Sequence, residues 1–208
     1  MDPNETGPLD PKAAMELLTD AREKAGRAFD INGALLYGAW ALAWLVGYLA
    51  IWLSVRGQAT YRGPDARAIV LLSLCMVGAL VVTVRTIGTA ARGVTGLSST
   101  SGSMFGFSWA VAFACFYAIL ASLVRAGISD EAIGLLAGAG PALVVSIIYL
   151  VGGALWLDWT MFVVGAWLAL VVGVAVMFGP VVLGLLMAIF GGGGFLVAAA
   201  YEWRRRRL

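Results

Sequence analysis

Six long apolar runs constrain the fold more than any other feature of this sequence. The runs extend over residues 31–55, 67–91, 104–124, 131–157, 159–178 and 180–201. A helix rises about 1.5 Å per residue, so about 20 residues match the roughly 30 Å hydrocarbon core of a bilayer. None of the runs shows the short alternating pattern of a membrane-barrel strand. The sequence therefore predicts an all-α bundle of six transmembrane helices.

The last two runs are separated only by Gly179-Pro180. Merged, they would form a helix of about 60 Å, twice the thickness of the hydrocarbon core. We therefore predict a turn at this dipeptide, with Pro180 opening the final helix. A five-span alternative would place Arg204–Arg207 outside the cell, where positive charge is disfavoured.

Charged residues are scarce, and the basic ones are unevenly placed. Only 12% of the residues are charged, whereas a soluble domain has about 25%. With six spans, one side of the membrane holds Lys12, Arg22, Lys24, Arg27, Arg85, Arg92 and Arg204–Arg207. The other side holds Arg56, Arg62, Arg67 and Arg125. Since basic residues favour the cytoplasm, we predict a multi-pass cell-membrane protein with both termini cytoplasmic.

Two polar segments flank the predicted membrane domain of residues 31–203. Residues 1–30 begin as a polar tail and continue, from Asp10-Pro11, as an amphipathic cytoplasmic helix. This helix either packs on the bundle or the membrane surface, or binds a cytosolic protein partner. The tail, residues 204–208, carries the arginine cluster, which anchors the last span and can bind anionic lipid.

The sequence contains no histidine. Its absence excludes histidine-ligated haem, most zinc and copper sites, and Ser–His or Cys–His catalysis. Cys75 and Cys115 lie inside apolar runs and lack metal-ligand spacing. The connection from Gly93 to Ser103, a predicted flexible loop, lacks the lysine motif of a phosphate-binding loop. We expect no enzyme activity, no metal or other cofactor, and no nucleic-acid partner.

Three irregular features could line a path for a small solute. The first run places Trp40, Trp44, Tyr48 and Trp52 at four-residue steps, as an aromatic ridge. The fourth contains Gly138-Ala139-Gly140-Pro141, which should kink or break its helix, and the sixth contains Gly191–Gly194. Broken helices can expose backbone groups to a substrate. The candidate lining residues are Trp44, Tyr48, Arg85, Gly140, Pro141, Gly191, Gly192, Gly193 and Gly194. Arg85, the only basic residue well inside a span, either snorkels to the cytoplasmic surface or contacts an anion or headgroup.

Rows of small residues offer a second interpretation of the glycines, as positions of close helix packing. The rows are Ala39, Ala43 and Gly47; Ala110, Ala114, Ala118 and Ser122; and Gly184, Ala188 and Gly192. Small residues at four-residue steps let two helices approach closely in lipid. The pairs Gly102/Gly106 and Gly134/Gly138 fit the same pattern and leave a homodimer open.

Two functions follow from these features. The first is transport of a small solute through the bundle, and proton coupling is disfavoured because no acid lies deep in a predicted span. Glu202 is expected at the interface of the tail. The alternative is a non-catalytic membrane scaffold or regulatory subunit that binds a protein partner through the cytoplasmic N-terminal helix.

Overall fold

The computed structural model describes residue 15, residues 32–90 and residues 97–207, and the secondary structure in these ranges is helical. The elements are α2 (Gly33–Val55), α3 (Ala66–Ala90), α4 (Leu97–Arg125), α5 (Asp130–Trp156), α6 (Trp159–Val176), α7 (Gly179–Leu186), the π-helix η1 (Met187–Gly192) and α8 (Gly193–Arg205). The last three form one continuous helix. The predicted N-terminal amphipathic helix lies outside the described residues, apart from Met15.

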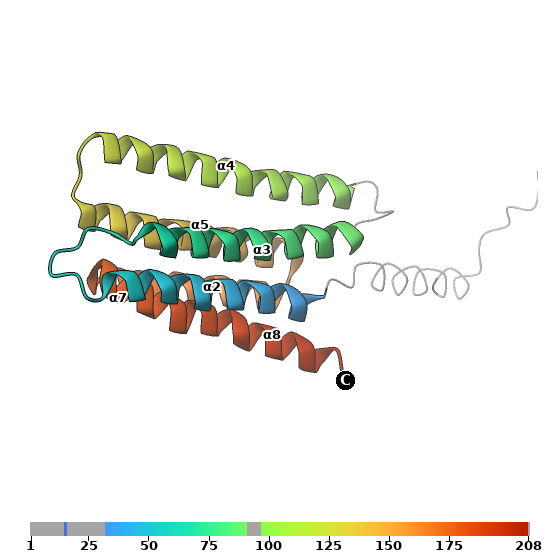
Figure 1. Cartoon of the computed structure of the whole chain (residues 1–208). Coiled ribbons are helices and arrows are strands. Elements are labelled where there is room, and N and C mark those ends of the chain that lie inside the picture. Colours follow the sequence, from blue (N-terminus) through green and yellow to red (C-terminus); the bar gives the residue numbers. More distant parts are fainter. Residues whose placement is uncertain (1–14, 16–31, 91–96, 208) are drawn as a thin grey trace, which may run out of the picture.

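Six helices in the described part of the chain are long and apolar enough to cross a membrane. They coincide with the six predicted runs to within a few residues at most ends. The start of α2 and the end of α8 lie at the same end of the bundle (Figure 1). This arrangement agrees with an even number of spans.

Polar side chains cap several of these helices, as their sequences suggest. The side chain of Asn32 accepts a hydrogen bond from the backbone N–H of Leu35, and that of Ser129 accepts one from Ala132. Gly179 has a φ of 81° and begins α7, and Pro180 lies in the first turn of this helix. The predicted turn between the last two runs is therefore confirmed.

Four of the membrane-length helices form the centre of the bundle, and two lie at its edge. α2, α5, α6 and the α7–η1–α8 helix pack on one another, whereas α3 packs mainly on α2 and α4 mainly on α5. Figure 1 shows α4 along the outer edge of the bundle. α5 and α6 cross closely, since a Cβ on Gly165 would stand 2.7 Å from the backbone nitrogen of Leu150. The buried core therefore lies around α2, α5, α6 and α8.

One prediction about local structure is wrong, and a second is wrong in the part that concerns a break. The segment up to Ser103 is not all loop, because α4 begins at Leu97. Helix propagation is cooperative, so the strongly apolar span extends into these serines and threonines. α5 also continues through Pro141 without a break. Other helices pack at the neighbouring glycines, with Leu183 of α7 against Gly138 and Phe116 of α4 against Gly140. Proline removes only one backbone hydrogen bond from the helix.

Candidate functional site

The candidate site is the centre of the bundle, where Trp44 and Tyr48 of α2 face η1, α8 and α5. Residues four apart lie on one side of a helix, so the two rings are neighbours, with centroids 5.4 Å apart. Only 3% of Trp44 and 6% of Tyr48 is exposed. The aromatic ridge of the sequence is thus an interior feature at these two positions.

Trp44 lies directly against the glycine run. A Cβ on Gly191 would stand 2.8 Å from Cε3 of the indole ring, closer than packed side chains approach. The indole also contacts the ring of Phe195, with the centroids 5.2 Å apart in an edge-to-face arrangement. The absent side chain of Gly191 is what makes room for the tryptophan.

Tyr48 connects α2 to the glycine–proline stretch of α5. Its hydroxyl donates a hydrogen bond of 2.9 Å to the backbone oxygen of Gly138. Gly138 also contacts α7, since a Cβ at this position would meet the side chain of Leu183. The glycine therefore serves a three-helix contact within the chain.

The other glycines of the run are contact positions with one exception. A Cβ on Gly192 would stand 2.7 Å from Cγ of Leu45, and one on Gly194 would stand 2.5 Å from Cδ1 of Trp167. A Cβ on Gly193 would meet nothing within 4 Å. Gly191–Gly194 is therefore a packing surface for α2 and α6, and its backbone is helical.

Part of this packing surface belongs to a π-helix. Met187–Gly192 has π-helical hydrogen bonding, a form that is rare and often found at functional positions. The indole N–H of Trp167 in α6 donates a 2.8 Å hydrogen bond to the backbone oxygen of Phe190. This contact ties α6 to the irregular turn.

Not all of the predicted site residues lie here. Gly140 faces the ring of Phe116 in α4, on another side of α5. Pro141 is half-buried within α5, and Arg85 is exposed on α3. The structure brings Trp44, Tyr48 and Gly191–Gly194 together and leaves Arg85 outside this group.

One polar atom in the centre lacks a partner. In the described part of the chain, Nε1 of Trp44 is the one buried side-chain nitrogen or oxygen without a hydrogen bond. A buried donor without an acceptor costs about 1–3 kcal/mol. By contrast, Nε1 of Trp40, on the same helix, donates to Oγ1 of Thr83 at 2.9 Å.

A buried acid that was not predicted from the sequence lies at one end of the bundle. Glu202 is only 7% exposed, and its Oε1 accepts a 2.7 Å hydrogen bond from Oγ1 of Thr160. Its Oε2 lies 3.6 Å from the guanidinium of Arg205, and its side chain also lies next to Gly33. In the sequence, the one indication of this site is a single carboxylate among the apolar residues that precede Arg204–Arg207. Glu202 therefore joins α2, α6 and α8.

The arrangement defines the class as an α-helical bundle with the six apolar helices of a multi-pass membrane protein. Comparison with protein-family models, with curated proteins and with solved structures gives no match to this chain.

Proposed function

We propose that this chain is a non-catalytic membrane subunit that binds another transmembrane helix through α4. In this proposal the six helices cross a cell membrane, and both termini lie in the cytoplasm. The observation that carries it is a row of small residues on α4 that is exposed along its whole length. The row consists of Gly102, Gly106, Ala110, Ala114, Ala118 and Ser122.

Support comes first from how little of α4 is used inside the chain. No residue in the apolar span of α4 is buried. In the spans of α2, α6 and α7–α8, a third or more of the residues are buried. A Cβ on Gly102 or Gly106 would meet nothing within 4 Å. The helix is therefore attached to the bundle along one side only.

The attached side of α4 is aromatic. The ring of Phe105 lies 4.6 Å from that of Trp156, and the ring of Trp109 lies 6.0 Å from that of Tyr149, in both cases edge to face. At 100° per residue, Ala110 and Ala114 lie on a different side of the helix from these rings. This division leaves the small-residue side for a second helix.

The geometry of the row also defines the expected contact. Residues at four-residue steps form a ridge inclined to the helix axis, and two such ridges cross at about −40° to −50°. The row winds around α4, so a crossing helix contacts its middle, at Ala110 and Ala114. Close approach there increases van der Waals contact, the main source of helix association in lipid.

The packed centre of the bundle favours binding of a partner helix over passage of a solute. The glycines that could have opened a path lie against Trp44, Leu45 and Trp167 instead. Tyr48 similarly closes on Gly138. These contacts favour a packed support for α4 over a channel.

The proposal is tested by photo-crosslinking in native membranes. A benzophenone amino acid replaces Phe107, which is 70% exposed and shares a helix side with Ala110 and Ala114. We expect a crosslink to a polypeptide that disappears in the Ala110→Leu, Ala114→Leu double variant. It should persist with Ala166→Leu, an equal change at an exposed alanine of α6. Lipid adducts alone, or a crosslink that is insensitive to the double variant, would refute the proposal.

A second candidate, passage of a small solute, is favoured by the unpartnered N–H of Trp44 beside the π-helix. A solute with a hydrogen-bond acceptor would satisfy that donor. Trp44→Phe keeps most of the ring and removes the donor. For this candidate, we expect solute flux through vesicles containing the wild-type chain and little flux with the folded variant. Flux at the lipid-only background for the wild type would eliminate this candidate.

A further inference from the structure

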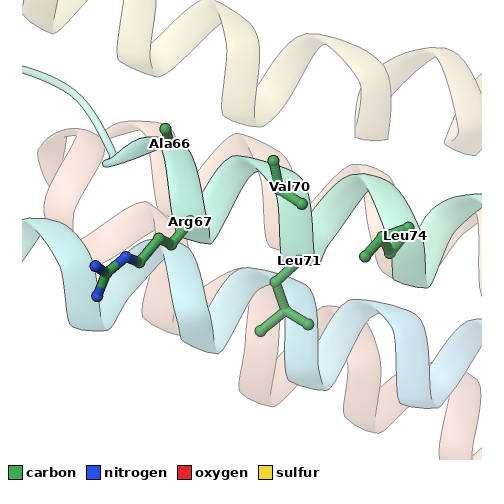
Figure 2. A pocket seen from close by; sticks show the side chains of 5 residues that line it. All are labelled: Ala66, Arg67, Val70, Leu71 and Leu74. Carbon is green, nitrogen blue, oxygen red and sulfur yellow. The ribbon is translucent and has the colours of Figure 1, made fainter.

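A shallow groove runs along the first turns of α3, on the surface of the bundle. It has a volume of about 330 Å³ and is lined by Ala66, Arg67, Val70, Leu71 and Leu74 (Figure 2). Ala66, Val70 and Leu74 follow one another at four-residue steps and are exposed. Four of the five lining residues are apolar, and the fifth carries a positive charge.

The charge lies at one end of the groove. In Figure 2 the guanidinium of Arg67 extends past the start of α3, away from Val70 and Leu74. Within the described residues Arg67 forms no ion pair. The nearby carboxylate of Asp65 caps α3, because its Oδ1 accepts a 2.8 Å hydrogen bond from the backbone N–H of Ala68. The guanidinium is thus available to an external anion.

We propose that this groove binds a phospholipid, with its phosphate on Arg67 and one acyl chain along Ala66, Val70 and Leu74. A guanidinium presents paired N–H donors that match phosphate oxygens. From Ala66 to Leu74 the helix rises about 12 Å, enough to hold the first half of a chain in the hydrocarbon layer. The phosphate end coincides with the end of the apolar helix, where headgroups lie.

The same site explains an irregularity in the charge distribution. Under the proposed topology, Arg67 lies on the external side, where basic residues are disfavoured. Arg56, on the same side, stacks on the ring of Trp52 at 5.0 Å. A headgroup phosphate supplies Arg67 with the counter-charge that the described protein residues do not. The inference concerns α3 and is independent of a partner on α4.

Lipid binding is measured by native mass spectrometry of the full chain released from detergent micelles. The probe is phosphatidylglycerol, and the comparison ligands are diacylglycerol with the same acyl chains and inorganic phosphate alone. We expect phosphatidylglycerol to bind more tightly than either. Arg67→Gln should weaken it about tenfold, as expected for the loss of a charge-assisted pair. Val70→Trp should weaken it as well, by filling the groove.

Arg62→Gln is the matched control, since Arg62 is an exposed arginine of the preceding loop that does not line the groove. Equal affinities for the Arg67→Gln and Arg62→Gln chains would overturn the proposal. Equal binding of diacylglycerol would do so as well, because the phosphate would then have no role. A change in subunit number with Val70→Trp, without a change in bound lipid, would assign the groove to a protein partner instead.

Discussion

The indole ring of Trp44 occupies the space that a side chain on Gly191 would fill, with Cε3 of the ring 2.8 Å from the position of that missing Cβ. The contact joins α2 to the π-helical turn at the centre of the bundle. One position along, Gly192 meets Leu45 in the same way. At the glycine run, α2 and the last helix thus approach each other closely.

The four glycines should differ in their tolerance of alanine. A Cβ on Gly192 would stand 2.9 Å from the backbone nitrogen of Leu45, so Gly192→Ala must displace α2 and should destabilise by about 1–3 kcal/mol. Gly193 faces open space. Gly193→Ala should therefore be neutral, or stabilising by up to about 1 kcal/mol, through helix propensity. Thermal unfolding in detergent, followed by circular dichroism, gives the Tm of both variants. Equal shifts in Tm would contradict the different packing of Gly192 and Gly193.

The indoles of Trp44 and Trp167 should respond differently to loss of their N–H groups. Trp167→Phe removes a hydrogen bond to Phe190 and should destabilise by about 0.5–1.5 kcal/mol. Trp44→Phe removes a donor that has no acceptor in the described chain, so stability should be unchanged or increased. Trp159→Phe, at a position 77% exposed, is the control for loss of ring area. A larger loss with Trp44→Phe than with Trp167→Phe would show that the Trp44 donor has an acceptor.

Glu202 should stabilise the end of the bundle mainly by accepting a hydrogen bond. Glu202→Ala leaves the hydroxyl of Thr160 without its partner and should destabilise by about 1–3 kcal/mol. Glu202→Gln retains an oxygen acceptor and should cost less. Glu131→Ala, at an exposed position in the first turn of α5, should have the smallest effect. Chemical denaturation in mixed micelles gives the free energy of unfolding of each variant. An equal loss of stability for Glu202→Ala and Glu202→Gln would assign the effect to the charge of Glu202 instead.

Tyr61, in the connection between α2 and α3, should titrate at unusually high pH. Its hydroxyl lies against Gly134 of α5, and burial, followed by the charge of Asp130, raises its pKa from the usual value of about 10. The folded state therefore favours the neutral phenol. Its stabilising effect is complete below about pH 10 and decreases as the pH rises toward the higher folded pKa.

An alkaline titration of tyrosinate absorbance, with the Tyr61→Phe chain subtracted, isolates this group. We expect Asp130→Asn to lower the pKa of Tyr61 toward its usual value by removing a like charge. Glu131→Gln, one residue further along the same exposed turn, should have less effect. An unchanged titration curve for Asp130→Asn would leave burial as the only cause.

Much of the helical organisation could be predicted because it depends on local properties. Apolar length placed the six helices, and Gly179-Pro180 ended one and started the next. Two small-residue rows were also predicted correctly as packing faces: Gly184 and Gly192 lie against Trp52 and Leu45, and Gly47 lies against Leu72. Close approach of backbones needs small residues, and that requirement is visible in the spacing alone.

Other features depended on neighbours that the sequence does not specify. Pro141 was expected to kink or break its helix, but α5 continues through it without a break. Contacts from α2, α4 and α7 lie at the neighbouring Gly138 and Gly140. Glu202 was expected at the interface, and its burial beneath the start of α6, which supplies Thr160, was not predicted. Neither neighbour can be recognised from the local sequence.

The sequence by itself determined that the chain forms six apolar helices and that α2 begins where α8 ends, at one end of the bundle. Only the tertiary structure decided which faces of these helices are used within the chain. It placed Trp44 against Gly191 inside the bundle and left Ala110 and Ala114 outside. The physical reason is that lipid chains are as apolar as the side chains they surround. Hydropathy therefore predicts a membrane-spanning helix, but it does not distinguish the side that meets protein from the side that meets lipid.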